Sequence, residues 1–348
     1  MQLDSTEYNI NFVGNELDSM TVKIGEPSKV KDGRETYTVY PILVNSVITA
    51  HHRYRDFDWL RNELSAKYPG CSTPALPDKE GVTSYWTNQD TLFYQFRRHG
   101  LEKFLQRISS HLKLSKSPDF LSFLKDDELN FAIRVKNSDS NKGWYGYIST
   151  LGTTLASTVT NYISPEYSFN QDEGDFEFSS SKSEINNIFL SQDTLCQQGK
   201  SLITSEENEI TSSLALAKAY ENMSKVEKDS LSDKLKTLAE THNLLSEAKK
   251  SSIDKLKEIV GQLMEDNKRV TQGLLETLER RSKIKAEKNS GNFDLREIDS
   301  DIREELKNFN SEKKFLSQTV SKELILYKQE LSEKISEIWR EAYNRISV

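Results

Sequence analysis

The sequence predicts an α+β domain, made of a three-stranded antiparallel sheet plus helices, followed by an all-α coiled-coil domain of three long helices. Two observations predict this order. Residues 1–125 combine alternating, strand-like runs with helical patterns, whereas residues 181–348 contain no proline and repeat apolar side chains every three or four positions. At 348 residues the chain is also longer than most single cores.

The class of the first domain follows from the order of its patterns. Three runs alternate apolar and polar residues as half-buried antiparallel strands do, and they span residues 8–12, 20–24 and 36–44. Helical spacing of apolar residues follows at 57–67 and 93–110. Strands that are followed by helices predict a small α+β domain.

Residues 126–180 are rich in Ser, Asn, Thr, Gly and Asp, which predicts a linker. Within it we expect an amphipathic helix at about 143–163, because bulky apolar residues share one face while Ser and Thr occupy the other. The residues of this face that we expect to insert into a membrane are Trp144, Tyr147, Ile148, Leu151 and Leu155. Permanent packing of the helix on a neighbouring domain is the alternative.

The helical half is predicted from the length of its apolar stripes. The stripe from Leu295 to Ala342 runs for about fifty residues, or roughly 75 Å of helix. Breaks near 229–233 and at 289–292 divide the region into three antiparallel helices. Such helices exceed ordinary globular lengths and favour dimerisation, because one short bundle cannot bury so much apolar surface alone.

Composition argues against several classes of function. The net charge of −7 argues against general nucleic-acid binding, which needs a broad basic face. The His and Cys residues form no metal-ligand spacing, and no Gly-rich nucleotide loop is present, so we expect neither a cofactor nor enzymatic activity. Cys71 and Cys196 are expected to be free thiols. Without a secretory signal or a long apolar run, the chain is expected to be cytoplasmic, with peripheral membrane contact.

Three basic clusters in the first domain indicate a pocket for an anionic sugar head group. They are the segments Arg53–Phe57, Pro74–Lys79 and Arg97–Leu101. Arginine matches phosphate oxygens with a planar fork of donors, and an adjacent aromatic ring offers a flat wall for a sugar. A proline-rich loop holds a lysine at the rim with little ordering cost. For any single arginine, an ordinary surface charge is the alternative interpretation.

Together the three clusters resemble the motifs of the phox-homology (PX) family. The resemblance implies that Arg53 holds a 3-phosphate and that Tyr54 packs against an inositol ring. It further implies that Lys79 meets the 1-phosphate and that Arg97 contacts the free ring hydroxyls at positions 4 and 5. The implied ligand is phosphatidylinositol 3-phosphate.

Three residues near these clusters carry further expectations. His52 stands where many members of the PX family have arginine; its protonation could tune attraction to a membrane, or it could simply be a strand residue. Tyr85 and Trp86 follow the proline loop, where the family tends to place a membrane-penetrating loop. Both side chains suit the bilayer interface, and partial burial is the alternative.

A basic cluster precedes the predicted turn at 289–292 and is expected at a tip of the bundle. Its members are Arg280, Arg281, Lys283, Lys285 and Lys288. Such a concentration suits anionic lipid, at about 1 kcal/mol per Lys or Arg near the surface, whereas a solvated face is the alternative. Acidic residues open the next helix: Asp294, Glu297, Asp299, Asp301, Glu304 and Glu305.

A PX domain, an amphipathic segment and a terminal three-helix coiled coil together resemble the sorting nexins with a BAR domain. The resemblance implies a PX domain at 1–125, a linker at 126–180, and a BAR domain for dimerisation and curvature at 181–348. It implies a non-enzymatic peripheral protein on the cytosolic face of endosomal membranes, which senses or induces curvature in tubular sorting and retrieval.

The partners implied by this resemblance are anionic membrane, a second PX-BAR chain in a homodimer or heterodimer, and cargo or retrieval-coat proteins. The sequence leaves the choice among them open. A phosphoinositide-anchored coiled-coil scaffold or tether, without membrane remodelling and serving a pathway such as autophagy, is the alternative function.

Overall fold

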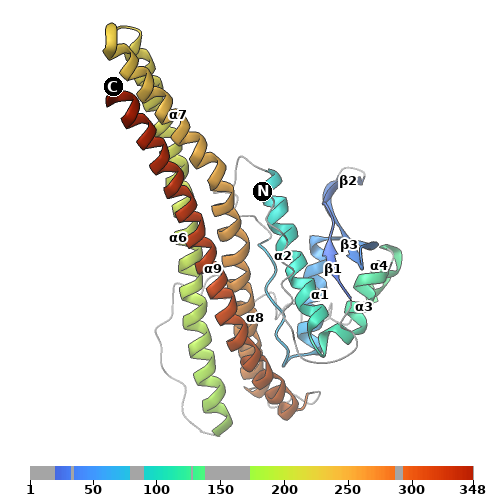
Figure 1. The fold of residues 1–348 in the computed structure, drawn as a ribbon. Coiled ribbons are helices and arrows are strands. Elements are labelled where there is room, and N and C mark those ends of the chain that lie inside the picture. The colour runs from blue at the N-terminus through green and yellow to red at the C-terminus, as the bar shows by residue number, and fades with distance from the viewer. Residues whose placement is uncertain are drawn as a thin grey trace. The chain divides into compact units, whose positions relative to one another are not determined.

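The computed structural model describes residues 20–32, 35–78, 90–126, 128–137, 173–286 and 293–347 (Figure 1). The chain divides into two compact units, which are treated separately below. Unit 1 comprises Met1–Gly81, Arg97–Lys182 and Gln272–Glu305. Unit 2 comprises Val82–Phe96, Ser183–Thr271 and Leu306–Val348.

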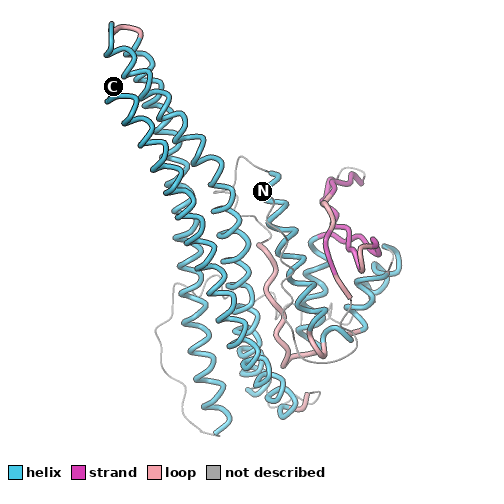
Figure 2. The backbone as a smooth tube through the Cα atoms, viewed as in Figure 1, coloured by secondary structure: helices cyan, strands magenta, loops and turns pink. Residues whose placement is uncertain are grey.

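The sheet of unit 1 is antiparallel throughout and is organised around its longest strand (Figure 2). Its strands are β1 (Val22–Ile24), β2 (Ser28–Asp32), β3 (Glu35–Val44) and β4 (Val47–Arg53). Residue Val39 of β3 pairs with both Ser28 and Arg53, and Ile42 pairs with both Ile24 and Ala50. A strand residue has one neighbour on each side, so β1 and β2 follow the same edge of β3 and β4 forms the other edge.

The α+β class is confirmed, but the described sheet has four strands where the sequence predicts three. The expected strands at 20–24 and 36–44 are β1 and β3, while the one at 8–12 lies outside the described residues. β2 was missed because Ser-Lys-Val-Lys-Asp carries a single apolar residue, as an edge strand can. No strand is predicted at 47–53, although the interpretation of His52 as a strand residue agrees with β4.

Helices cover the sheet and complete the core of unit 1. They are α1 (Tyr54–Lys67), α2 (Asp90–Ser110), the short 3₁₀ helix η1 (Leu114–Lys116), α3 (Pro118–Lys125) and α4 (Glu128–Asn137). Fully buried side chains from the sheet and three of these helices form one cluster, including Tyr40, Phe57, Leu101, Phe104 and Phe123. The predicted helices at 57–67 and 93–110 are therefore confirmed.

The expected linker at 126–180 contains helical residues at both of its ends. Phe131 of α4 is 5% exposed and packs into the core of unit 1, so the folded part extends past residue 125. Residues 173–180 of the expected linker belong to α6 (Glu173–Ser224). The amphipathic helix predicted at 143–163 lies outside the described residues.

The all-α half is confirmed as three long helical segments. The first is α6 (Glu173–Ser224); the second is continuous through α7 (Asp229–Glu258), the π-helical turn η3 (Ile259–Met264) and α8 (Glu265–Ala286); the third is α9 (Leu295–Ser347). The first break lies at residues 225–228, just before the predicted 229–233, and the predicted break at 289–292 lies outside the described residues, between the end of α8 at Ala286 and the start of α9 at Leu295. No helix among the described residues combines the length and apolar character needed to span a bilayer.

Within unit 2 these helices lie side by side and share one apolar core (Figure 1). Its most buried members include Ile203 of α6, Leu256 of α7, Val260 of η3 and Tyr327 of α9. The π turn brings Val260 close to α6, where a Cβ on Gly199 would lie 2.9 Å from Val260 Cγ2. A larger residue at position 199 would therefore force the two helices apart.

A charged network crosses the α6–α8 contact of unit 2. The Glu265 carboxylate lies 2.7 Å from Lys200 Nζ and 2.9 Å from Lys268 Nζ. Burial alone would raise the pKa of Glu265, but Lys268 and Lys200 outweigh it and lower this pKa from 4.5 to about 2. The folded state thus gains stability from the ionised carboxylate above pH 4.5, and this stability is lost as the pH falls towards 2.

We therefore expect Glu265→Gln to lower the free energy of unfolding at pH 7 by about 3 kcal/mol, the equivalent of this pKa shift. The variant should also lose less stability than the wild type between pH 4.5 and pH 3, because it lacks the titrating group. Urea unfolding followed by circular dichroism at both pH values measures each quantity. Equal stabilities of the two proteins at pH 7 would show that the network contributes nothing.

Candidate functional site

The first predicted pocket residue, Arg53, stands where β4 passes into α1. Its pairing with Val39 ends the β3–β4 ladder, and its backbone N–H donates to Asp56 Oδ2 at 2.8 Å, which caps the first turn of α1. The guanidinium carbon lies 3.4 Å from the ring centroid of Tyr37 on β3. This cation–π contact restrains the guanidinium, and a guanidinium held through its face can donate to a phosphate from its edge.

Tyr54 and Arg97 lie together beside the proline loop. The Tyr54 hydroxyl donates a hydrogen bond to the carbonyl oxygen of Pro77. Burial raises the pKa of Tyr54 above its usual value, which keeps this hydroxyl protonated. The Arg97 guanidinium on α2 lies 5.0 Å from the Tyr54 ring centroid and donates to the carbonyl oxygen of Asp78 at 3.1 Å. The structure thus joins the strand, loop and helix clusters of the sequence around Tyr54.

Several predicted site residues lie outside the described part of the chain. Lys79 follows Asp78, the last described residue of the proline loop. The residues expected to insert into a membrane also fall there: Tyr85, Trp86, Trp144, Tyr147, Ile148, Leu151 and Leu155. Their roles stay predictions.

His52 is a core residue and faces away from solvent. It is 2% exposed, its ring stacks on Phe123 at 3.8 Å between centroids, and its Nε2 lies 2.6 Å from the carbonyl oxygen of Phe123. A carbonyl can only accept, so Nε2 carries a proton and donates it. The geometry favours the strand-residue interpretation over direct tuning of a membrane surface.

The predicted basic tip is only partly available to a lipid surface, which corrects the sequence-based expectation for two of its members. Arg280 and Arg281 are each 5% exposed. Arg281 forms a two-point ion pair with Asp299, at 2.6 and 3.1 Å, and its guanidinium carbon lies 4.0 Å from the Phe178 ring centroid. Lys283 is half-buried and Lys285 is exposed, whereas Lys288 lies outside the described residues.

Arg280 lies inside unit 1 and forms a hydrogen bond to the loop that follows α1. It donates to the carbonyl oxygen of Pro69 at 3.1 Å, and burial lowers its pKa to about 10, so it stays charged at neutral pH. From the same helix, Thr277 Oγ1 donates to the carbonyl oxygen of Cys71 at 3.5 Å. We call residues 69–74 and the parts of α8 and α9 that contact them the loop junction.

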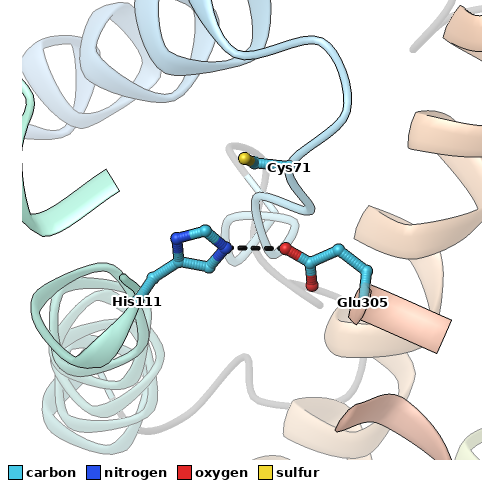
Figure 3. A group of neighbouring side chains, drawn as sticks. All are labelled: Cys71, His111 and Glu305. Atoms are coloured by element: carbon cyan, nitrogen blue, oxygen red, sulfur yellow. Dashed lines mark hydrogen bonds and ion pairs between the residues drawn. The ribbon is translucent and has the colours of Figure 1, made fainter. Parts of the chain in front are cut away.

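Cys71 and Glu305 of this junction form a side-chain cluster with His111, in which one polar or sulfur atom of each residue lies within 4.8 Å of the others (Figure 3). His111 Nε2 lies 2.7 Å from Glu305 Oε1, while His111 Nδ1 accepts the backbone N–H groups of Lys113 and Leu114 at 3.2 and 3.1 Å. Nδ1 therefore has no proton, and Nε2 donates its own to Glu305. A cation at Nε2 would need a nitrogen lone pair that this tautomer lacks, so we assign the cluster to hydrogen bonding.

The sequence reasoning missed the loop junction. Its contacts join residues about two hundred positions apart, and neither apolar periodicity nor a short motif marks them. The acidic residues at the start of α9 are the sequence feature that could have indicated this junction. From the sequence they are interpreted as a solvated face, but Asp301 and Glu297 lie 2.8 and 2.9 Å from Lys113 Nζ.

A protein-family model and several known chains match parts of this sequence. The PX domain model matches residues 41–127, which include Arg53, Tyr54 and Arg97. Sorting nexin 1 of Arabidopsis thaliana is 32% identical over 117 residues, or 31% of this chain and 29% of that protein. Sorting nexin-30 of Mus musculus is 34% identical over 129 residues, or 34% of this chain and 29% of that protein.

The fold is shared over a much greater length. A chain in the cryo-EM structure of the SNX-BAR Mvp1 tetramer aligns with 93% of this chain and 100% of its own length, at a TM-score of 0.61 and 15% identity. This likeness adds the BAR-type helical half to the PX domain. The chain therefore contains a PX domain and shares the fold of a SNX-BAR chain.

The chain aligns with less than half of the length of these curated relatives, so the function of a whole relative cannot be transferred to it directly. The alignments to the two relatives reach 29% of each relative's own length, and sorting nexin-4 of Gibberella zeae is aligned over 37% of its length at 27% identity. These likenesses show a PX domain at residues 41–127 and a fold shared with the SNX-BAR chain. The lipid that the chain binds, its protein partners and its cellular compartment are proposed below.

Proposed function

We propose that this chain is a non-enzymatic peripheral membrane protein that binds phosphatidylinositol 3-phosphate on the cytosolic face of endosomes. The observation that carries the proposal is the arrangement around Tyr54. Arg53 precedes it in the chain, Arg97 lies over its ring, and the loop leading to Lys79 accepts a hydrogen bond from its hydroxyl. An arginine over an aromatic wall, with a second arginine next to that aromatic residue in the chain, suits a phosphorylated sugar ring.

Each residue of this pocket has a distinct part in the proposal. Arg53 pairs with the 3-phosphate, because its stacked guanidinium offers a fixed fork of donors. Tyr54 supplies the surface against which the inositol ring packs. Arg97 donates to ring hydroxyls, and Lys79 meets the 1-phosphate that joins the sugar to the lipid.

Dimerisation through the helical half is the second part of the proposal. Large apolar side chains remain exposed along α6 and α9: Leu195, Leu216, Met223, Phe315, Ile325, Trp339 and Tyr343. A second PX-BAR chain, the same or a different one, would cover them. Such a dimer would place two lipid pockets on one particle and raise avidity for a membrane of suitable curvature. Cargo and retrieval-coat proteins are the further partners that we propose for tubular endosomal sorting.

Sedimentation with liposomes tests this function. The full chain is mixed with vesicles of about 50 and about 400 nm diameter, each made with and without phosphatidylinositol 3-phosphate at equal net charge. We expect binding that depends on the lipid and is stronger on the small vesicles. Binding that depends on the lipid alone would favour a tether, and binding that ignores the lipid would refute the proposed pocket.

A further inference from the structure

We propose that helix α8 is part of the construction of the phosphoinositide pocket: Gly273 and Glu276 are positioning residues for the loop whose far end forms the pocket rim. The inference rests on the proposed function and deepens it. Its subject is residues 69–78, which begin in the loop junction and end at Tyr54 and Arg97. All of these residues belong to unit 1.

The first step is the close approach of the loop to α8. A Cβ added at Gly273 would collide with the carbonyl oxygen of Thr73 and would lie 3.0 Å from Pro74 Cα. Both neighbours are backbone atoms, which cannot turn aside as a flexible side chain can. Glycine at position 273 therefore sets how near the loop can come to the helix.

The second step is a relay through Arg61 of α1. Its Nε donates to the carbonyl oxygen of Pro74 at 2.8 Å, and its other end forms an ion pair with Glu276 of α8. The side chains of Arg61 and Glu276 are only 14% and 13% exposed. Partial burial weakens solvent screening, so Glu276 holds the guanidinium firmly, and the guanidinium in turn holds the loop.

Further contacts fix the beginning of the same loop. Arg280 donates to the carbonyl oxygen of Pro69 at 3.1 Å, and the backbone N–H of Ser72 donates to Glu305 Oε1 at 3.2 Å. Thr73 is fully buried and shares a 2.6 Å hydrogen bond with Ser65 of α1. The loop is therefore held at successive residues before it reaches the pocket.

The last step is the path from Pro74 to the pocket rim. Pro74 and Pro77 restrict the backbone between these anchors, since each fixes its own φ angle. The carbonyl oxygens of Pro77 and Asp78 then receive the hydrogen bonds of Tyr54 and Arg97. A displacement at Pro74 is thus transmitted to the groups that orient Tyr54 and Arg97, and preorganisation of the pocket is lost.

The test uses the full chain and a soluble probe, inositol 1,3-bisphosphate, which removes the contributions of avidity and membrane insertion. Isothermal titration compares the wild type with Gly273→Ala and with Glu276→Gln. Ser282→Ala is the matched control, because Ser282 is exposed on the same helix and its hydroxyl donates to the carbonyl oxygen of Leu278 in its own helix backbone. We expect about tenfold weaker binding for Gly273→Ala, about threefold to tenfold for Glu276→Gln, and no change for the control.

A second readout separates positioning from general damage. Attraction to liposomes that carry phosphatidylserine but no phosphoinositide depends on net charge and not on pocket shape. It should be unchanged in Gly273→Ala and Ser282→Ala, and it should not weaken in Glu276→Gln, which removes one negative charge. Should Gly273→Ala fail to fold, Glu276→Gln alone tests whether α8 positions the loop, because this variant keeps the size of the side chain and removes only its charge.

The outcomes distinguish this inference from the function on which it rests. Arg53→Ala is titrated in the same series. Loss of binding in Arg53→Ala together with wild-type affinity in both α8 variants would overturn the positioning role and leave the pocket intact. Wild-type affinity in Arg53→Ala, or no binding by the wild type, would refute the pocket itself.

Discussion

Arg53→Ala is expected to lower the affinity for vesicles containing phosphatidylinositol 3-phosphate by about tenfold to a hundredfold. Hydrogen bonds to a charged group contribute about 1.5–3 kcal/mol each, and Arg53 is the residue that we place on the 3-phosphate. The backbone N–H of Arg53 caps α1 through Asp56 whatever the side chain is, so the local fold should persist. Flotation or sedimentation with vesicles of fixed net charge measures the change.

Arg55 provides the matched control for this experiment. It is two residues away, carries the same charge, and its side chain is 74% exposed with Asp56 at 3.7 Å. Arg55→Ala should reduce general attraction to anionic vesicles only slightly, and equally with and without the phosphoinositide. An equal loss of binding in the two variants would mean that surface charge, and not a pocket, holds the protein on the membrane.

Ile325→Glu is expected to convert the proposed dimer into monomers. Ile325 is 65% exposed on α9, and it lies on the same side of the helix as Trp339 and Tyr343, which follow at fourteen and eighteen residues. A carboxylate is tolerated at an exposed position of a monomer but is costly when a second chain covers it. We expect the dimer dissociation constant to rise by about a hundredfold or more, which sedimentation velocity over a range of protein concentrations can measure.

Glu337→Lys is the control for the dimer experiment. Glu337 is exposed on α9 about 120° around the helix from Ile325, at 100° per residue. It tests whether any charge change on this helix disturbs association. Dimers that persist in Ile325→Glu, or that dissociate equally in both variants, would argue against a contact through the face of Ile325, Trp339 and Tyr343.

The parts of the fold that the sequence predicts well are those with local, periodic signals. The long α9 stripe and the β3 alternation reflect contacts that repeat at fixed intervals along the chain. Arg53, Tyr54 and Arg97 could be proposed from the sequence because each lies in a short motif, and their roles stay predictions. The loop junction could not, since Arg280 and Pro69 meet only after the entire chain between them has folded.

Arg280 and Arg281 show why charge patterns mislead when taken alone. In sequence they stand in a basic run, and a run of like charge is ordinarily solvated. In the structure each is buried because a partner lies elsewhere in the chain: the Pro69 carbonyl for Arg280 and the Asp299 carboxylate for Arg281. His52 is a similar case, since its burial against Phe123 depends on α3 and not on its neighbours in β4.

The central claim is that the pocket around Tyr54 reads the 3-phosphate, and competition with soluble head groups tests it most directly. The full chain is bound to vesicles containing phosphatidylinositol 3-phosphate and is then challenged with inositol 1,3-bisphosphate or inositol 1,4-bisphosphate, which carry equal charge. We predict release by the 1,3-isomer at concentrations where the 1,4-isomer leaves the protein bound. Equal release by both isomers, or release by neither, would contradict the account.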